Sequence, residues 1–251
     1  ISIGFEVKDG PSATITFKNG RCRMEQGVNK CDVKLPFSSC EKFNGLIDGT
    51  VTPIPSKGFQ HIKFLLKTFT PLTDLLAKYM RPSPEDLQDR TFFEQSTTLM
   101  LYTIAVAISQ IANNDKIGQF SASHIVDGEI GFGIKDGPAV TIRAKNGRLV
   151  TIKKRCENPR AEMEFASMDL ARDLFDGKIN AVACIGMGAI TMKGMISMID
   201  NMNRLLDRVA LYLAKGRGTL MSFKINDYTK SREMFERAEK VIPSGVYGHL
   251  G

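Results

Sequence analysis

The sequence predicts an α+β protein made of two copies of one module, and three observations support this prediction. Residues 3–21 and 130–148 are identical at 13 of 19 positions, at an offset of 127. In both copies, apolar residues alternate on either side of Asp-Gly and Asn-Gly pairs, a pattern typical of β-hairpins. A segment with helical apolar spacing then follows the strands. Because a sheet with one apolar face needs a cover, we expect each copy to be an antiparallel sheet covered by helices.

The first copy shows strand signals around Asp9-Gly10 and Asn19-Gly20, followed by a late strand within residues 31–37. Ser38 and Glu41 have the spacing of a capping box, which predicts a helix after that strand. The inward face of this helix is expected to hold three apolar residues: Phe43, Leu46 and Ile47. Beyond it, three prolines are expected to interrupt regular structure: Pro53, Pro55 and Pro71.

The second copy shows the same order of signals. Its strands are expected to place these residues inward: Phe132 and Ile134, then Val140, Ile142 and Ala144, then apolar residues within 149–154, then Ala161, Met163 and Phe165. Ser167 is expected to cap a helix that ends at Asp176-Gly177. A strand with Ile190 and Met192 precedes a helix with a long apolar stripe, which is made of Met195, Ile196, Met198, Ile199, Met202, Leu205, Leu206, Val209 and Leu213.

The two copies are expected to be joined by a hinge at residues 82–89 and a long helix over residues 91–112. The apolar part of this helix is about half as long as a membrane span needs, so we expect it to be buried in protein. The domain boundaries that follow are residues 1–82 for the first copy, 83–222 for the second with its leading helix, and 223–251 for a linker and a further region. The chain begins within a strand pattern, so residues are expected to precede Ile1.

These features together resemble the sterol carrier protein type 2 family: short antiparallel strands, a helix closed by residues 176–178, a strand that ends in Lys193-Gly194, and a hydrophobic helix. The closest part runs over residues 165–206. The first copy departs from the pattern, since Leu65-Leu66 stands where the second copy has Lys193-Gly194. The resemblance implies a hydrophobic tunnel between sheet and helices that holds a sterol, a fatty acyl chain or an acyl-CoA. Whether both copies bind, or one only supports the other, stays open.

We expect the apolar pocket in the second copy, between the sheet and the last helix. The residues expected to line it are Phe132, Ile134, Phe165, Leu174, Phe175, Ile190, Met192, Met195, Ile196, Met198, Ile199, Met202 and Leu206. Methionines are concentrated between Met163 and Met202, and their flexible side chains adapt to varied ligand shapes. A methionine and leucine stripe is also an ordinary core pattern, so both interpretations remain.

The sequence offers no catalytic residue and no metal site. The GxSxG, GxGxxG and P-loop patterns are absent, and the three histidines are far apart. The five cysteines are odd in number and include no CxxC spacing, which favours reduced thiols in a cytoplasmic protein. The short basic clusters behind the net charge of +7 either lie in solvated turns and strand ends or attract an anionic membrane surface or an acidic ligand. Nucleic acid is not an expected partner, because Trp is absent and basic residues do not alternate with aromatic ones.

Residues 227–251 have no counterpart in either copy. The segment has an amphipathic face and a stop at Pro243, and it is similar to the N-terminal entry of class III aminotransferases of the glutamate-1-semialdehyde aminomutase type. The resemblance implies pyridoxal phosphate chemistry only after Gly251, no cofactor within this chain, and a homo-oligomer formed through the fused enzyme. A docking helix of the second copy is the alternative. Three functions stay open: an apolar-ligand module, the front of an aminotransferase, and a purely structural pseudo-dimer.

Overall fold

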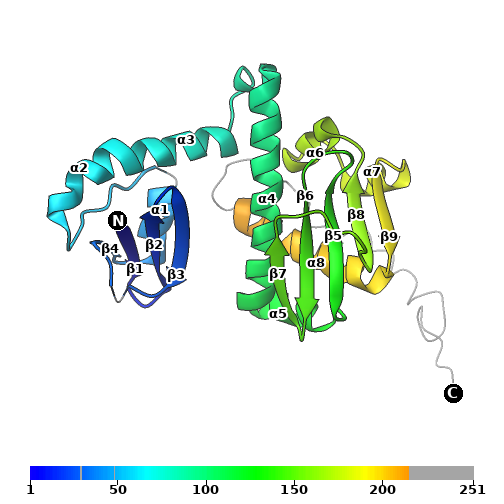
Figure 1. The fold of residues 1–251 in the computed structure, drawn as a ribbon, viewed down its shortest axis with the longest axis horizontal. Helices are drawn as coiled ribbons and strands as arrows, with labels where there is room; N and C mark the ends of the chain where they lie inside the picture. Colours follow the sequence, from blue (N-terminus) through cyan, green and yellow to red (C-terminus); the bar gives the residue numbers. More distant parts are fainter. Residues whose placement is uncertain (29, 48, 215–251) are drawn as a thin grey trace, which may run out of the picture.

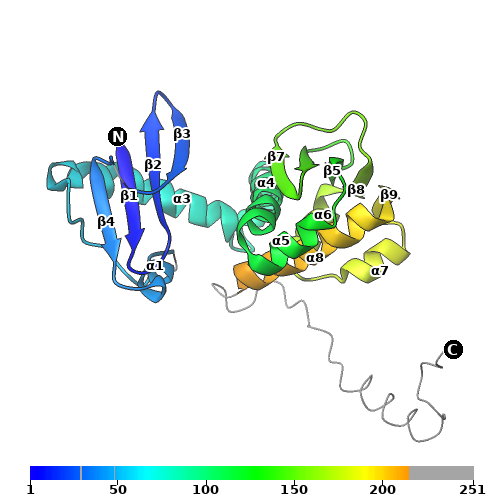
Figure 2. The same cartoon turned by 90° about the horizontal axis from the view of Figure 1, so that it is seen from below.

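Two sheets, each flanked by helices, make up the protein, which confirms the α+β class (Figure 1). The structure is a computed structural model and describes residues 1–28, 30–47 and 49–214. We refer to residues 1–82 as the N-terminal unit and to residues 83–214 as the C-terminal unit. Helix α3 runs from the first sheet to helix α4, and this bridge is visible from two directions (Figures 1 and 2).

The N-terminal unit has a four-stranded sheet and a run of helical segments. Its elements are β1 (Ser2–Val7), β2 (Ser12–Lys18), β3 (Arg21–Gln26), β4 (Val33–Phe37), α1 (Cys40–Ile47), the 3-10 helix η1 (Phe59–His61), α2 (Ile62–Phe64), the π-helical segment η2 (Leu65–Phe69) and α3 (Thr70–Met80). The strand order is β3-β2-β1-β4.

The C-terminal unit repeats this sheet and adds one strand and more helices. Its elements are η3 (Asp86–Gln88), α4 (Arg90–Asn114), α5 (Lys116–Ser123), β5 (Gly128–Ile134), β6 (Ala139–Lys145), β7 (Arg148–Ile152), β8 (Ala161–Phe165), α6 (Met168–Phe175), α7 (Ala181–Gly186), β9 (Ile190–Gly194) and α8 (Ile196–Ala214). The strand order is β7-β6-β5-β8-β9. Helices α5 and α7 were not predicted, whereas β8 matches the expected residues.

The strand register is the same in the two sheets. Ile3 pairs with Ile15, and 127 positions later Ile130 pairs with Ile142. One pairing in each sheet is parallel, β1 with β4 and β5 with β8, so the prediction of purely antiparallel sheets was wrong. Hairpin turns in the sequence predict only antiparallel pairs of consecutive strands. Strands β4 and β8 instead follow a segment that crosses the sheet, so each runs parallel to its neighbour.

Gly4 on strand β1 makes room for the crossing chain of the first sheet. A Cβ on Gly4 would stand 2.7 Å from the sulfur of Cys31 and 2.9 Å from a methyl carbon of Val28. Gly131, at the equivalent place in the second sheet, would bring a Cβ within 3.6 Å of Pro159. A side chain at Gly4 would therefore push the crossing segment off the sheet. At Gly131 the added Cβ would meet the Glu162 side chain at 3.3 Å, and its distance to Pro159 is an ordinary contact.

The hairpin turns confirm the Asn-Gly prediction. Asn19 and Asn146 have φ of 50° and 51°, and the glycine after each has φ of 70°. Two consecutive residues with positive φ define the type I′ turn, whose backbone twist matches that of the flanking strands. Asn and Gly tolerate positive φ best.

Two details of the helices differ from the prediction. Helix α1 is capped by Ser39, whose Oγ accepts a hydrogen bond from the backbone N–H of Lys42 at 3.3 Å, and the expected cap at Ser38 was wrong. Ile47 is 61% exposed and does not face inward. Ser167 caps α6 as expected, accepting a hydrogen bond from the Leu170 N–H at 3.1 Å.

Pro71 was expected to interrupt regular structure, but the chain around it is helical. It lies in the first turn of α3, directly after the π-helical segment η2. The backbone is helical from α2 through η2 into α3, and the wider π turn lies just before Pro71, which has no backbone N–H to donate. The prolines at 53 and 55 do lie in a segment without helix or strand.

A charged cluster joins helices α5 and α8 at the start of α5. Asp115 accepts hydrogen bonds from Arg208 Nη2 and the Tyr212 hydroxyl, both at 2.7 Å, and from the Gly118 N–H at 2.8 Å. The Arg208 guanidinium, followed by Tyr212 and the Gly118 N–H, lowers the pKa of Asp115 to about 2 against the opposing effect of burial. The charged carboxylate is therefore favoured in the folded state.

The substitution Asp115→Asn is expected to lower the free energy of unfolding near neutral pH by about 2 kcal/mol, since each pKa unit corresponds to about 1.4 kcal/mol. Asn can still cap α5, so the substitution removes mainly the charge. A depressed carboxyl pKa stabilises the fold above its ordinary value of 3.8, and that stabilisation is lost as the pH falls to about 2. Urea unfolding at several pH values measures this, and a variant-to-wild-type difference that stays constant down to pH 2 contradicts the assignment.

Candidate functional site

Most of the residues expected to line a pocket lie together in the core of the C-terminal unit. Eight of them are buried: Phe132, Ile134, Phe165, Phe175, Ile190, Met198, Ile199 and Met202. Four more are partly buried against the same cluster: Leu174, Met192, Met195 and Leu206. Ile196 is 80% exposed and is not part of the cluster. The structure therefore brings twelve of the thirteen residues together between the second sheet and its helices.

This core is filled by its own side chains. The ring of Phe165 makes T-shaped contacts with Phe132 at 5.5 Å and with Phe175 at 5.7 Å between ring centroids. Met198 and Met202 are fully buried on α8, which lies against the sheet. A ligand at this place would have to displace packed side chains.

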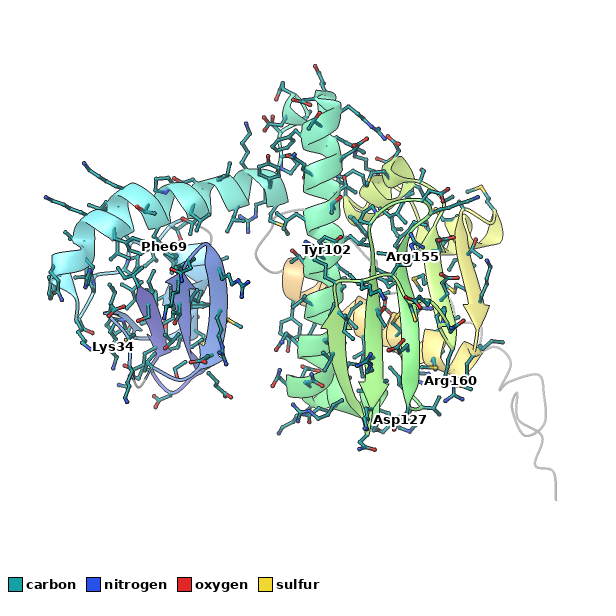
Figure 3. The ribbon with its side chains drawn as sticks, in the orientation of Figure 1. Lys34, Phe69, Tyr102, Asp127, Arg155 and Arg160 are labelled. Atoms are coloured by element: carbon teal, nitrogen blue, oxygen red, sulfur yellow. The ribbon has the colours of Figure 1, made fainter. Side chains whose placement is uncertain are left out.

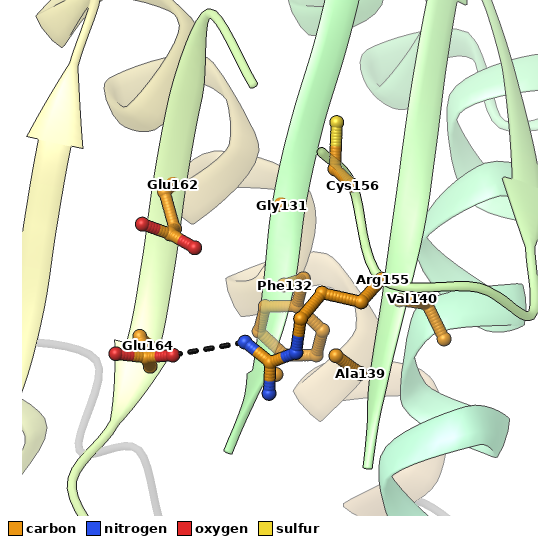
Figure 4. A pocket seen from close by; sticks show the side chains of 9 residues that line it. Gly131, Phe132, Ala139, Val140, Arg155, Cys156, Glu162 and Glu164 are labelled. Atoms are coloured by element: carbon orange, nitrogen blue, oxygen red, sulfur yellow. Dashed lines mark hydrogen bonds and ion pairs between the residues drawn. The ribbon is translucent and has the colours of Figure 1, made fainter. Parts of the chain in front are cut away.

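The open face of the second sheet carries a small polar hollow (Figure 4). Arg155 lies over this face, pairs with Glu164 at 3.0 Å, and donates a hydrogen bond to the carbonyl of Gly137 at 3.2 Å. The remaining space is too small for a water molecule. Burial, and next the Glu129 carboxylate that accepts a hydrogen bond from the thiol at 3.2 Å, raise the pKa of Cys156. The thiol is thus held protonated, which does not suit a nucleophile.

A wider hollow of about 880 Å³ lies on the open face of the β2–β3 hairpin. Three exposed cations line it, Lys18, Arg21 and Arg23, and Arg23 pairs with Glu25 at 3.1 Å. The hollow is open to solvent and polar, so it offers no site for an apolar ligand.

The apolar surface that is left incompletely covered lies in the N-terminal unit. Five half-buried phenylalanines meet between the first sheet and the helical segments, and we call them the phenylalanine cluster: Phe5, Phe17, Phe43, Phe64 and Phe69. Phe17 contacts both Phe64 and Phe69, with ring centroids 6.3 Å and 6.1 Å apart. Phe5 contacts Phe43 at 6.3 Å and Phe69 at 6.4 Å. Figure 3 shows Phe69 between its helical segment and the sheet.

The π-helical turn explains how Phe64 and Phe69 reach the same ring. Residues five apart do not share a face of an α-helix, whereas the wider π turn brings them close to alignment. Thr70 supports this turn, because its hydroxyl donates a hydrogen bond to the carbonyl of Leu65 at 3.0 Å. Such turns occur often at functional sites, so the geometry at Leu65–Phe69 marks this region as a candidate site.

The two cores differ in how completely helices cover them. Among the described residues, the N-terminal cluster has five fully buried apolar side chains and the C-terminal cluster has twenty-eight. In the C-terminal unit, α4, α5, α6 and α8 contribute to the cover, whereas the first sheet is covered by α1, α2 and η2. The phenylalanine cluster is therefore covered less completely by helices than the core of the C-terminal unit.

The pocket expected from the sequence lies in the other copy, and that expectation stays a prediction; the phenylalanine cluster was not predicted from the sequence as a second candidate. A signal was present, because seven of the fifteen phenylalanines lie within residues 1–82. The helical spacing of residues 62–80 was hidden by the extra residue in the π turn, which shifts the apolar pattern between Phe64 and Phe69.

Residues that could hold a metal ion do not gather anywhere in the described ranges. Within the same ranges, no helix has the length and apolar character needed to cross a bilayer. The five cysteines are all free. The aminotransferase-like segment and Leu213 of the apolar stripe have no described side chains, so both predictions about them stay predictions.

No protein-family model and no curated protein matches the chain. Several solved structures are similar to part of it. The sterol carrier protein domain 2 of Helicoverpa armigera is 20% identical with a TM-score of 0.36, covering 44% of this chain and 88% of that one. A protein described as UbiJ-SCP2 ubiquinone synthesis protein is 12% identical with a TM-score of 0.35, covering 44% of this chain and 96% of its own.

Sterol carrier protein 2 from Yarrowia lipolytica, in its apo form, is 18% identical with a TM-score of 0.31, covering 42% of this chain and 88% of that one. At TM-scores this low, none of the structures assigns a residue or a ligand to this chain.

Proposed function

We propose that this chain is a non-catalytic module, made of two sterol-carrier-like copies, that binds an apolar ligand such as a fatty acyl chain or a sterol. The ligand binds at the phenylalanine cluster of the N-terminal unit, and the C-terminal unit acts as its folded support. The observation that carries this proposal is the contrast between five half-buried rings in one unit and a filled core in the other.

The energetics of apolar burial favour a ligand at the cluster. Full burial of a phenylalanine contributes about 1.5–3 kcal/mol relative to exposure, so half-buried rings leave part of that free energy unused. Each methylene that a ligand buries adds about 0.8 kcal/mol. A long acyl chain laid on the rings gains from both surfaces, and this gain offsets the cost of ordering the chain. No polar motif is needed, which fits the absence of one in the sequence.

The substitution Phe69→Ala is expected to weaken the binding of a fluorescent fatty acid about tenfold, since losing one ring contact costs on the order of 1–2 kcal/mol. Phe69 is suited to this test because it contacts both Phe5 and Phe17. Fluorescence titration measures the dissociation constant, and circular dichroism shows whether the fold is kept.

Phe120→Ala is the matched control for this titration. Phe120 is 63% exposed on α5 of the C-terminal unit, far from the cluster in the sequence, and among the described rings it contacts only that of His124. The control is expected to bind like the wild type. Equal dissociation constants for the wild type and Phe69→Ala would show that the ligand does not bind at the cluster. The residues predicted in the C-terminal core are then the next candidates.

We propose further that the chain continues into a class III aminotransferase, which would bring pyridoxal phosphate and a homo-oligomer. Support comes only from the sequence of residues 227–251. The reading frame beyond Gly251 tests the proposal. A frame that continues with a lysine-containing pyridoxal phosphate domain supports it, and a stop codon soon after Gly251 contradicts it.

A further inference from the structure

The positive charge of this protein is concentrated in the N-terminal unit. Residues 1–82 contain twelve Lys and Arg against seven Asp and Glu, a net charge of +5. Residues 83–214 contain fifteen Lys and Arg against sixteen Asp and Glu, a net charge of −1. Most of the excess lies in the helical stretch 57–81, which has five cations and a single anion, Asp74.

The same stretch exposes large apolar side chains. Phe59 is 58% exposed, Ile62 is 44% exposed and Leu66 is 63% exposed, and their spacing of three and four residues places them along one side. Phe64, Leu65 and Phe69 pack against the first sheet instead. The exposed residues are therefore on a side of the helix that the sheet does not cover.

Two exposed lysines flank this apolar row. Lys63 and Lys67 follow Ile62 and Leu66 directly in the sequence, and no ion pair or hydrogen bond to either lysine occurs among the described residues. We name Phe59, Ile62, Lys63, Leu66 and Lys67 the basic apolar face. Its composition, apolar side chains beside unpaired lysines, is typical of helices that lie in the surface of an anionic membrane.

We propose that the basic apolar face docks this protein on an anionic lipid surface. The apolar row enters the boundary between headgroups and acyl chains, and the two lysines bind headgroup phosphates or carboxylates. The charge distribution favours a lipid surface over a second copy of this chain, because two faces with the same positive charge repel each other. The membrane is contacted from one side, in keeping with the finding that no described helix could cross it.

Co-sedimentation with vesicles tests the proposal. The wild-type chain is expected to bind vesicles of phosphatidylcholine with phosphatidylserine, to bind pure phosphatidylcholine weakly, and to be released by salt. The variant Lys63→Glu/Lys67→Glu is expected to bind at least about thirtyfold more weakly, since each lost basic residue near the surface costs about a factor of five and each new carboxylate is repelled. The variant Ile62→Ser/Leu66→Ser is expected to lose binding by a similar factor.

The variant Lys135→Glu/Lys145→Glu is the matched control. Both lysines lie in the C-terminal unit, both are exposed, and the double substitution changes net charge by the same amount. It is expected to bind like the wild type. Equal losses in the two lysine variants would mean that net charge alone attracts the protein, and this would overturn the proposed face.

Two other outcomes would also overturn the proposal. One is that the wild type binds neither kind of vesicle. The other is that Leu66→Ser abolishes a dimer seen by sedimentation while vesicle binding is absent, which would make a second copy the partner. Vesicle binding that is lost only with the face variants supports the proposal, whatever the phenylalanine cluster binds.

Discussion

The substitution Phe165→Ala is expected to lower the free energy of unfolding of the C-terminal unit by about 3–5 kcal/mol. Phe165 is 2% exposed and lies between the rings of Phe132 and Phe175. Truncation removes both edge-to-face ring contacts and leaves a cavity. The close-packed neighbours can move in only partly to fill it. Urea unfolding followed by circular dichroism measures the change.

The same variant also separates the two candidate ligand sites. If the ligand binds at the phenylalanine cluster, the folded Phe165→Ala protein should bind a fatty acid probe like the wild type. Phe120→Ala, with an exposed ring, is expected to change stability by no more than about 0.5 kcal/mol. A folded Phe165→Ala protein that no longer binds the probe would place the ligand in the C-terminal core.

The substitution Arg172→Ala is expected to lower the free energy of unfolding by about 3–5 kcal/mol, the usual effect of removing one partner of a buried ion pair. Arg172 is 3% exposed, and it pairs with Asp176 through Nε and Nη2, both at 2.9 Å. Its Nη1 donates a hydrogen bond to Ser96 Oγ at 3.0 Å. Ser96 in turn donates to the carbonyl of Tyr79, so one polar chain connects α6, α4 and the end of α3.

Removing the guanidinium leaves the partly buried Asp176 carboxylate without its main cationic partner, and it leaves the Ser96 hydroxyl oxygen without the hydrogen bond that Arg172 donates. Lys178, 3.3 Å from Asp176, compensates only in part because it is more exposed. Arg90→Ala is the matched control, since Arg90 joins the same helices α4 and α6 through Asp169, with both side chains more than half exposed. That exposed pair is expected to contribute little to the free energy of unfolding. Equal losses in the two variants would contradict the role given to Arg172.

Local chemistry made some parts of the fold predictable. Asn-Gly pairs at 19 and 146 require positive φ at two successive positions, and the structure has it at both. Ser167 and the Asp176-Gly177 stop bound α6 closely, because caps satisfy backbone groups that only a helix end exposes. The strand register is also repeated in the two sheets, since identical turns enforce identical pairing.

Other parts depend on contacts between distant residues, which local patterns do not encode. The parallel pairing of β4 beside β1 arises from a crossing segment, and no turn residue specifies it. The apolar spacing of the stretch 62–80 changes phase at the π turn, so a search for a 3.6-residue period misses it. Helices α5 and α7 are short and place few residues in the core, and helices of this kind are fixed by tertiary packing.

The candidate site was harder to predict than the fold. The stripe on α8 satisfies the pattern of a core and of a pocket equally, and only packing distinguishes them: Met198 and Met202 are fully buried in a filled core. The phenylalanine cluster can be identified only once it is known which helices cover the first sheet, and the sequence does not give this information. A binding site without polar motifs leaves little trace in the sequence.

Native mass spectrometry of the purified chain, with added fatty acid and with the two phenylalanine variants, tests the central claim most directly. The account predicts one acyl ligand per chain in the wild type and in Phe165→Ala, and a strongly reduced ligand-bound fraction in Phe69→Ala. A wild-type chain that stays free of lipid and also rejects added fatty acid would contradict the account and leave the two units with a structural role.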